Sequence, residues 1–461
     1  MSPRPRAAVL GAGALLLVAA ASAAHTAAGA PARAATAPRP AITGHVARES
    51  LTFPPDTAWC RAHLQRSCYR PAQLRHAYGL DPLLARGLDG RGRTIAVVDS
   101  FGSPTIAADL HHFDQAFGLP DPPKLTVIHP AGAPPAFDPA NEDMVGWAEE
   151  TTLDVEWAHA MAPGAKLLLV VTPVSETEGI TGFPEIVRAE NHVVEHHLAD
   201  VISQSFGATE QTFPSAAALL GLRSAFRNAA EQGITVLGAS GDNGATDARL
   251  DQSCCYPMRV NSWPSSDPLV TSVGGTRLNL DAAGNRLSPD RVWNDDGGGA
   301  GGGGVSSIFD RPDFQDSVRS VVGDHRGTPD VSMSAAVDGA AVFYYSFANP
   351  KASAGGWHLV GGTSEATPLF AGIVAVAGQA AGRRLGVLND RLYRLAREDA
   401  SGIVDVVGGD NSLTFCASAC AAAVPVMVTV KGYPAVRGYD LATGLGTVDA
   451  SRLVRALSGR D

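Results

Sequence analysis

The chain has 461 residues, 45% of them hydrophobic and 18% charged, so it is long enough to bury one large core or two of ordinary size. Its formal net charge is −10, and the sequence has no basic footprint of the kind that contacts nucleic acid. We therefore expect a globular protein that does not bind nucleic acid.

The first 24 residues have the layout of a secretory signal peptide. Arg4 and Arg6 give a positive start, residues 7–20 are apolar, and small residues follow up to Ala24. A membrane anchor is the alternative, but the apolar run is short and rich in alanine, and no later segment approaches a membrane span. The sequence thus predicts cleavage near Ala23 and a secreted, extracellular protein with no membrane segment after cleavage.

Residues 25–67 are predicted to form a short leader. Residues 25–50 are rich in Ala, Pro and Thr, as flexible segments are, and globular character begins near Cys68 and continues to the end of the chain. We expect one domain over residues 68–461.

Six cysteines in an exported chain predict disulfide bonds. Cys254 and Cys255 are adjacent, and they could bond each other or separate partners. No Cys–His cluster has zinc-ligand spacing, which argues against a zinc site. The local pairs that spacing suggests are Cys60 with Cys68 and Cys416 with Cys420.

Short apolar runs that do not alternate with polar residues predict buried strands, and helical patterns lie between them. This arrangement favours an α/β fold in which a parallel sheet has helices on both faces. Function gathers at the carboxyl ends of such strands, where Asp99, Ser205 and Asp242 are expected. The apolar runs are 94–98, 166–171, 201–205 and 233–239.

The segment 149–160 predicts a helix that ends before Pro163, with Glu150 and Asp154 one turn apart on the same face. Taken alone, these acids suggest a solvated acidic face. His159 could be proposed as a base, but a lone histidine near a helix end is more often structural.

Two glycine-containing segments follow. Asp242 lies in the turn 241–244, and such Asx-Gly turns usually carry no chemistry. The run 297–304 is glycine-rich, and it is either a linker or a segment whose backbone contacts an extended ligand. It is not a phosphate-binding loop, because no Lys-Ser/Thr follows it.

The segment 361–368 places Ser364 after two glycines, immediately before an apolar run that predicts a buried helix. A serine there lies near the positive end of the helix dipole, where developing negative charge is stabilised. A simple helix cap is the alternative. The His-Gly-Thr-His motif that supplies the base of a subtilisin is absent.

Together these segments resemble the sedolisin family, the serine-carboxyl peptidases with a subtilisin-like fold, from about Cys68 to Leu457. Each motif alone is weak, and their order along the chain makes the resemblance specific. The motifs are Glu150-x-x-x-Asp154, Ser240-Gly241-Asp242-Asn243-Gly244 and Gly362-Thr363-Ser364-x-x-x-Pro368, supported by Val292-Trp293-Asn294 and Pro329-Asp330-Val331-Ser332.

The resemblance implies roles for five side chains. Ser364 is the nucleophile, Glu150 its general base and later acid, and Asp154 the group that orients Glu150. Asp242 stabilises the oxyanion, and Asp99 extends the proton network. A carboxyl base needs a raised pKa, and a carboxyl oxyanion donor must be protonated, so we expect activity at acidic pH.

The family also binds one calcium ion near its C-terminus. By resemblance, the carboxylates are Asp405 and Asp440, and the carbonyl ligands come from Val406, Val436 and Gly438. Oxygen ligands of this kind suit calcium. Val436 replaces a glycine that is usual in the family.

By the same resemblance, an extended peptide or protein substrate lies in a cleft between Ser205 and the segment containing Gly303, Gly304 and Ser306. We expect a monomeric, secreted peptidase, with exo or endo action left open. The family usually carries a long propeptide, and none is evident here. An inactive peptide-binding protein of the same fold and a neutral-pH subtilisin with an unorthodox histidine are the alternatives.

Overall fold

The computed structural model describes residues 50–295, 299–350, 355–398, 401–418, 420 and 425–459. The predicted signal peptide, residues 1–24, lies outside this part of the chain. No helix in these ranges is both long enough and apolar enough to cross a membrane.

The central sheet has eight strands in the order β10-β9-β7-β5-β2-β4-β3, with β13 also paired to β9. All of its pairs are parallel except β10 with β9. The four predicted strands are β2, β4, β5 and β7, so the α/β prediction is confirmed. The bounds are β2 (Thr94–Ser100), β3 (Leu125–Ile128), β4 (Lys166–Thr172), β5 (Val201–Gln204), β7 (Thr235–Ala239), β9 (Thr271–Arg277), β10 (Arg291–Val292) and β13 (Val331–Ser334).

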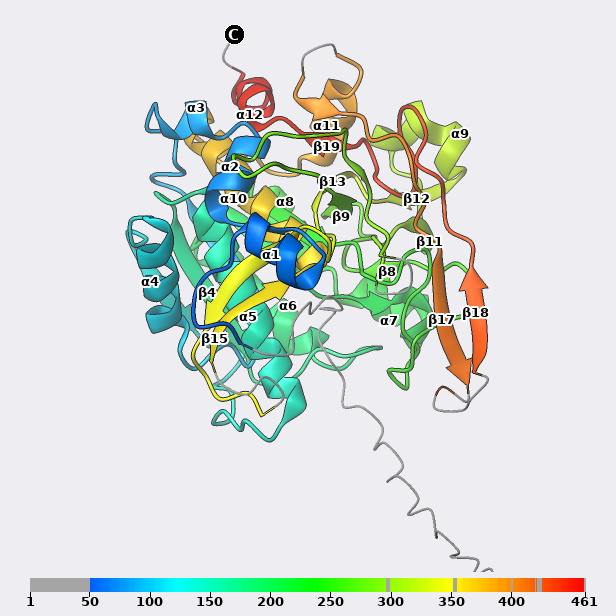
Figure 1. Ribbon diagram of the computed structural model, residues 1–461. Coiled ribbons are helices and arrows are strands. Elements are labelled where there is room, and N and C mark those ends of the chain that lie inside the picture. Colours follow the sequence, from blue (N-terminus) through cyan, green and yellow to red (C-terminus); the bar gives the residue numbers. More distant parts are fainter. Residues whose placement is uncertain are drawn as a thin grey trace, which may run out of the picture. The chain divides into compact units, whose positions relative to one another are not determined.

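Helices cover both faces of this sheet (Figure 1). Successive strand residues point to opposite faces, so Leu169 joins one core and Val170 the other. The first core contains α4 (Ile106–Phe117), α5 (Glu142–Met161), α10 (Thr363–Ala381) and α12 (Ala450–Ser458). The second contains α6 (Phe183–Glu195) and α8 (Ser224–Glu231).

Shorter elements surround the central sheet, and several strands form small sheets of their own: β1-β14-β15, β6-β8, β11-β12, β16-β19 and β17-β18. The helices are α1 (Thr57–Leu64), α2 (Pro71–Ala77), α3 (Asp81–Leu84), η1 (Glu210–Thr212), α7 (Ala216–Gly221), η2 (Asp313–Val318), α9 (Arg319–Val322) and α11 (Asn389–Leu395). The strands are β1 (Cys68–Tyr69), β6 (Ala208–Thr209), β8 (Ser262–Trp263), β11 (Gly304–Asp310), β12 (His325–Thr328), β14 (Ala340–Tyr345), β15 (Gly356–Val360), β16 (Ile403–Val404), β17 (Leu413–Ser418), β18 (Val426–Val430) and β19 (Thr447–Val448).

The folded unit begins before Cys68. The sequence predicted globular character only from Cys68 onward. The backbones of Leu51 and Trp357 exchange two hydrogen bonds of 2.9 Å. Helix α1 follows, capped by Asp56, and its Cys60 is fully buried and disulfide-bonded to Cys68. The part of the predicted leader between residues 51 and 67 therefore packs as part of the folded unit.

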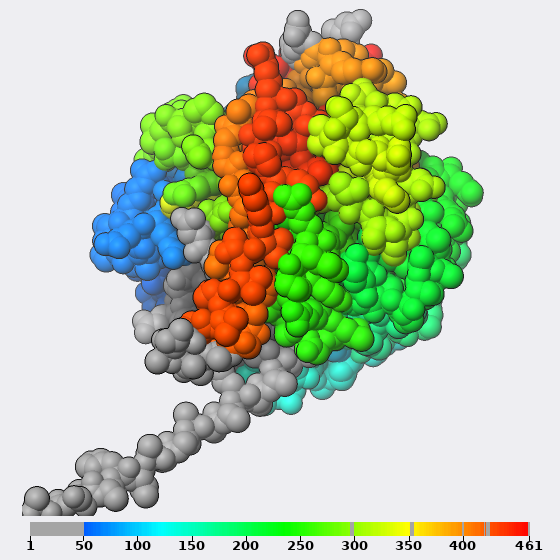
Figure 2. All heavy atoms as spheres, turned by 90° about the vertical axis from the view of Figure 1, so that its right-hand side faces the viewer, coloured from blue at the N-terminus to red at the C-terminus, as the bar shows by residue number. Residues whose placement is uncertain are grey.

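All six cysteines form disulfides: Cys60–Cys68, Cys254–Cys255 and Cys416–Cys420. The predicted local pairs are confirmed, and the adjacent cysteines bond each other. Buried Cys255 packs against Leu413 and Phe415 of β17 and Val430 of β18. Figure 2 shows a green segment of the surface lying beside the orange-red segment that contains the β17–β18 hairpin.

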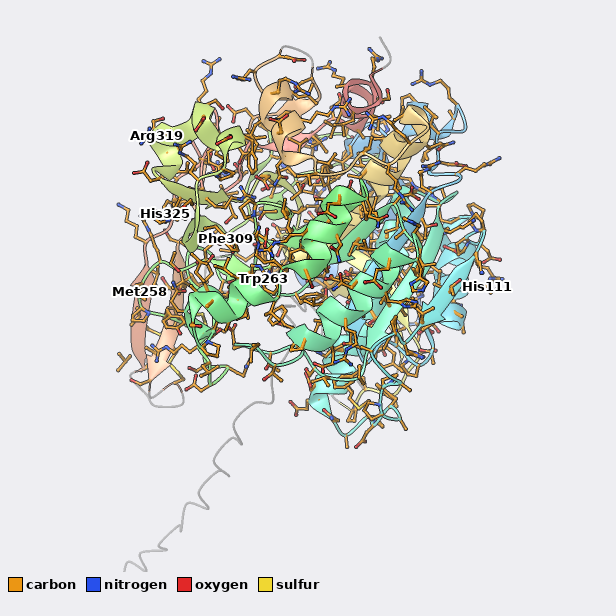
Figure 3. The ribbon with its side chains drawn as sticks, turned by 180° about the vertical axis from the view of Figure 1, so that it is seen from behind. His111, Met258, Trp263, Phe309, Arg319 and His325 are labelled. Atoms are coloured by element: carbon orange, nitrogen blue, oxygen red, sulfur yellow. A yellow bond between two sulfur atoms is a disulfide. The ribbon has the colours of Figure 1, made fainter. Side chains whose placement is uncertain are left out.

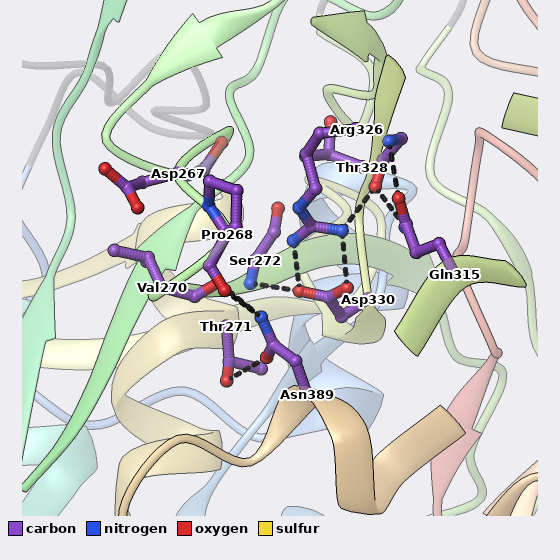
Figure 4. Close-up of polar contacts among 12 residues, drawn as sticks. Asp267, Pro268, Val270, Thr271, Ser272, Gln315, Arg326, Thr328, Asp330 and Asn389 are labelled. Atoms are coloured by element: carbon purple, nitrogen blue, oxygen red, sulfur yellow. Dashed lines mark hydrogen bonds and ion pairs between the residues drawn. The ribbon is translucent and has the colours of Figure 1, made fainter. Parts of the chain in front are cut away.

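A buried ion pair joins β12 to Asp330, which precedes β13 and binds β9 of the central sheet (Figure 4). The guanidinium of Arg326 donates to both carboxylate oxygens of Asp330, at 2.7 and 2.6 Å, and neither side chain is exposed. Asp330 also accepts the amide of Ser272 in β9 and the hydroxyl of Tyr393. Every oxygen of this carboxylate is thus compensated.

We expect Arg326→Met to lower the free energy of unfolding by about 3–5 kcal/mol, because it leaves Asp330 charged and buried without its cation. Denaturant unfolding measures this change. The control is Arg394→Ala, which breaks an exposed pair with Asp390 and should cost less than about 1 kcal/mol. Equal losses of unfolding free energy in the two variants would contradict the conclusion that the buried Arg326–Asp330 pair stabilises the fold more than an exposed pair does.

Candidate active site

Helix α5 carries two of the predicted catalytic carboxyls through the core. Asn141 caps the helix by accepting hydrogen bonds from the amides of Asp143 and Met144. Glu150 and Asp154 lie one turn apart on this helix, and neither is exposed. The interpretation as a solvated acidic face is therefore wrong.

Helix α10 begins at Thr363, so Ser364 lies in its first turn. Asp242, which follows β7, binds this end of the helix: its Oδ1 accepts the amide and the hydroxyl of Thr363, both at 2.7 Å. A Cβ on Gly362 would come within 2.7 Å of Asp242 Oδ2, and φ at this residue is +144°, so glycine is required here. Asp242 is consequently held against the turn that presents Ser364.

The two helices pack closely. Gly372 of α10 faces Met161 of α5, and a Cβ on the glycine would lie only 2.4 Å from the Met161 Cβ. This close approach fixes the separation of the two backbones that carry Ser364 and the acids of α5.

Ser205 lies within the carboxyl cluster, although it was predicted in the substrate cleft. Its hydroxyl donates to Asp154 Oδ1 at 3.0 Å and lies 3.4 Å from the backbone carbonyl of Ser364. Ser205 thus links Asp154 of α5 to the first turn of α10. The sequence predicts this serine at a strand end but carries no signal for its partner.

Burial is the main cause of the raised pKa values of Glu150, Asp154 and Asp99. It raises the pKa of Glu150 well above the usual range, and the negative charges of Asp154 and Asp99 raise it further. Burial and the charge of Asp99 raise the pKa of Asp154. Burial also raises the pKa of Asp99 to about 7, against a hydrogen bond from Thr151. These carboxyls therefore favour their protonated forms.

Ser364 and Glu150 face each other. The Ser364 hydroxyl lowers the pKa of Glu150, yet neither Ser364 Oγ nor the Glu150 carboxyl oxygens make a hydrogen bond of standard geometry. Catalytic hydrogen bonds are often loose before substrate binds and tighten in the complex.

The glycine-rich segment packs against the loop that carries Asp242. The amide of Ala300 donates to the Asp242 carbonyl, and the amide of Gly302 donates to Gly241. A Cβ on Gly303 would lie 2.2 Å from the Leu441 carbonyl, so the described glycines are needed for close backbone packing. The interpretation as a linker is wrong for residues 299–304.

The other predicted cleft residues are also buried. Gly304 begins β11, and the Ser306 hydroxyl donates to Glu210 at 2.6 Å. His159 is fully buried and contacts Asp114 and the Pro120 carbonyl, so its role here is structural.

The predicted calcium ligands gather around one loop. Asp405 Oδ2 accepts the Gly438 amide at 3.0 Å, and Asp440 Oδ2 accepts the Val436 amide at 2.9 Å. Val406 follows Asp405 in the chain. The described residues contain no group of three acidic, His or Cys side chains that could hold a metal ion. A calcium site here must therefore use backbone carbonyls, which fits the predicted donor set.

A family model described as the subtilase family matches residues 143–391, more than half of the chain. The chain belongs to the subtilase family. Within this family its similarity is to the sedolisins, as predicted. This subtilase is 32% identical to kumamolisin of Bacillus sp. (strain MN-32), over 85% of its own length and 64% of that protein. It is 30% identical to sedolisin of Pseudomonas sp. (strain 101), over 78% and 57% of the two chains.

The structural comparison agrees. The structure of Pseudomonas sedolisin complexed with two molecules of pseudo-iodotyrostatin aligns with 86% of this subtilase and 99% of that chain, at 26% identity and a TM-score of 0.68. The subtilase spans less than two thirds of the length of kumamolisin and of sedolisin.

Buried carboxyls also set the expected pH dependence of stability. Burial raises the pKa of Glu190 to about 8 and that of Glu178 to about 9. A carboxyl whose pKa is higher in the folded state binds its proton more tightly there, so its stabilisation is present below the unfolded pKa and lost as pH rises through the folded pKa. We expect the free energy of unfolding to fall from about pH 5 to about pH 9.

Urea unfolding at a series of pH values tests this expectation. Glu190→Gln removes one titrating group that is hydrogen-bonded to Gln204, and it should make the decline shallower below about pH 8. Stability that is constant or rises over this range would contradict the prediction.

Proposed function

We propose that this subtilase is a secreted serine-carboxyl peptidase that hydrolyses peptide bonds at acidic pH. The observation that supports it most directly is the position of Ser364, at the start of α10 and facing the buried Glu150. The similarity to kumamolisin and sedolisin supports the same function.

In the first step Ser364 Oγ attacks the scissile carbonyl while the Glu150 carboxylate accepts its proton. Asp154 holds Glu150 in place through charge and proton sharing, and Ser205 fixes Asp154 by donating to its Oδ1. Protonated Glu150 then gives its proton to the leaving amine. A water molecule then attacks the acyl-enzyme while Glu150 accepts its proton. Glu150 returns the proton to Ser364 Oγ as the ester bond breaks and the acid product leaves.

Asp242 stabilises the oxyanion as a proton donor. Its Oδ1 already accepts two hydrogen bonds from Thr363, so the acidic proton is carried by Oδ2. The start of α10 adds its positive dipole end to the same place. A carboxyl can donate in this way only while protonated, which requires an acidic medium.

Asp99 extends the proton network of Glu150 and Asp154. It is fully buried at the end of β2, and its charge acts on both Glu150 and Asp154. Its role is to hold a proton near Glu150 rather than to touch substrate.

We expect Ser364→Ala to abolish cleavage of a quenched peptide library, and Asp242→Asn to lower kcat by about 10²–10³, the usual effect of losing an oxyanion donor. Assays across about pH 3–8 should show activity on the acidic side only, because Asp242 can donate to the oxyanion only while it is protonated. Full activity of Ser364→Ala would disprove the mechanism.

The runner-up is an inactive peptide-binding protein of the same fold. It predicts that a folded chain binds peptides without cleaving them at any pH. The filled catalytic positions argue against it.

The resident metal in this proposal is one structural calcium ion held by the two carboxylates and the loop carbonyls around Gly438. We expect calcium to raise the melting temperature of the protein and a chelator to lower it, since a ligand at about 100 times its Kd stabilises the folded state by about 2.7 kcal/mol. Asp405→Asn should remove the calcium-dependent shift, while Asp390→Asn, an exposed acid elsewhere, should not. If calcium raises the melting temperature of Asp405→Asn as much as that of the parent protein, the ion binds elsewhere.

A further inference from the structure

The residue that follows the proposed nucleophile is a buried glutamate, and the mechanism above does not use it. Glu365 lies in the first turn of α10 and is 0% exposed. Acids are common in the first turn of a helix, because the helix dipole attracts negative charge there, but they are normally exposed to water. Complete burial of this carboxyl costs free energy unless polar groups around it compensate.

Three polar groups from other segments surround the Glu365 carboxyl. The hydroxyl of Ser334, at the end of β13, and the backbone of Ala341 in β14 lie close enough to lower its pKa, although neither forms a hydrogen bond of standard geometry with it. The third group is the phenol of Tyr78, whose oxygen accepts the Ser334 amide at 2.7 Å. Burial raises the pKa of this phenol, and the charges of Asp290 and Glu365 raise it further.

The cation beside Tyr78 is paired with a different acid. The guanidinium carbon of Arg286 lies 5.3 Å from the centroid of the Tyr78 ring, and its nitrogens donate to both carboxyl oxygens of Asp290, at 2.8 and 3.1 Å. Burial raises the pKa of Glu365 well above its usual range. Glu365 is therefore a neutral carboxylic acid at acidic pH, with one O–H that donates and oxygens that accept.

The start of α10 is also attached to the end of β13 through the backbone. The amide of Gly362 donates to the Ala335 carbonyl at 2.7 Å, and the amide of Glu365 donates to the Gly362 carbonyl at 3.0 Å. A Cβ on Gly361 would lie 2.6 Å from the same Ala335 carbonyl oxygen, so the two segments are in close contact. The Glu365 side chain adds a second link between them.

Two anchors thus hold the turn that carries Ser364, one on each side of it in the sequence. Thr363 is bound by Asp242, and Glu365 reaches β13 and β14. Side chains two residues apart on a helix point in nearly opposite directions, since each residue turns the helix by about 100°. Anchors on opposite sides resist rotation of this turn about the helix axis. Such a rotation would turn the Ser364 hydroxyl away from Glu150.

We propose that Glu365 is a positioning residue, whose buried carboxyl fixes the first turn of α10 against β13 and β14 and so keeps Ser364 directed at Glu150. This inference rests on the proposed peptidase function. Glu365 acts through the backbone of the turn and does not touch substrate. Its contribution is to kcat, because a displacement of about 1 Å in a reacting group can cost about 10²-fold in rate.

The test compares Glu365→Ala with Glu365→Gln. Alanine removes the link to β13, whereas the glutamine amide has the size of the neutral acid and keeps both a donor and an acceptor. We expect Glu365→Ala to lower kcat about 10–100-fold while KM changes less than about twofold. Glu365→Gln should retain about half or more of the parent kcat, because it preserves the hydrogen bonding of a neutral group.

The matched control is Asp109→Ala, which removes another fully buried acid. Asp109 lies on α4, the helix whose His111 is labelled at the edge of the molecule in Figure 3. It accepts the hydroxyl of Ser346 at 2.6 Å and belongs to neither anchor. This variant should lose unfolding free energy, as Glu365→Ala does, but keep the parent kcat. Urea unfolding gives the folded fraction by which each rate is corrected.

Three kinetic results would overturn the inference. The first is a parent-like kcat in Glu365→Ala, and the second is an equal loss of kcat in Asp109→Ala, which would make the effect one of stability alone. The third is a kcat for Glu365→Gln as low as that of Glu365→Ala, because hydrogen bonding by a neutral group would then not be what positions Ser364.

Hydrogen–deuterium exchange separates this inference from the proposed function, because it requires no cleavage. Faster amide exchange over residues 362–367 in Glu365→Ala, absent from Glu365→Gln and Asp109→Ala, supports the anchoring of this turn even if the parent protein cleaves nothing. Cleavage that depends on Ser364 but proceeds at the parent kcat in Glu365→Ala refutes the positioning role and leaves the function standing.

Discussion

The fold concentrates carboxyls in a place that water does not reach, and this constraint governs both its stability and its chemistry. Asp99, Glu150 and Asp154 are all fully buried, and their mutual repulsion adds to the cost of burial. Protonation of these carboxyls removes most of the free-energy cost of burying their charges. The condition that stabilises the molecule is therefore also the condition that lets an acid act as an oxyanion donor.

Two buried helices convert this electrostatic arrangement into fixed geometry. α5 carries the proposed base and α10 the proposed nucleophile, and the contact between Gly372 and Met161 allows their backbones to approach closely. Asp242 and Ser205 come from the ends of parallel strands and bind the two helices near Ser364. The proposed catalytic groups are thus positioned by the core.

The sequence predicted the central strands because unbroken apolar runs are characteristic of strands buried on both faces. Motif order located the residues of α5, α10 and the Asp242 loop, but it could not show that the α5 acids are buried or that Ser205 bonds Asp154. Those facts depend on packing between distant segments. The burial of Glu176 and Glu178 has no local signal, because acids in a loop normally indicate solvent exposure, and here Thr209 of β6 packs against Glu178. The packing of residues 51–67 could not be predicted, because the contact between Leu51 and Trp357 has no local signal.

The division between core and loops has a consequence for how such a molecule diversifies. A change on the buried surfaces of α5 or α10 disturbs the nucleophile and the main apolar core together, so few changes there are tolerated. The loop after β4, and the part of the loop after β7 that follows the Asp242 turn, reach the active region without contributing to that helix pair. New preferences can therefore arise by loop exchange alone, and directed evolution of this scaffold should concentrate its mutations there.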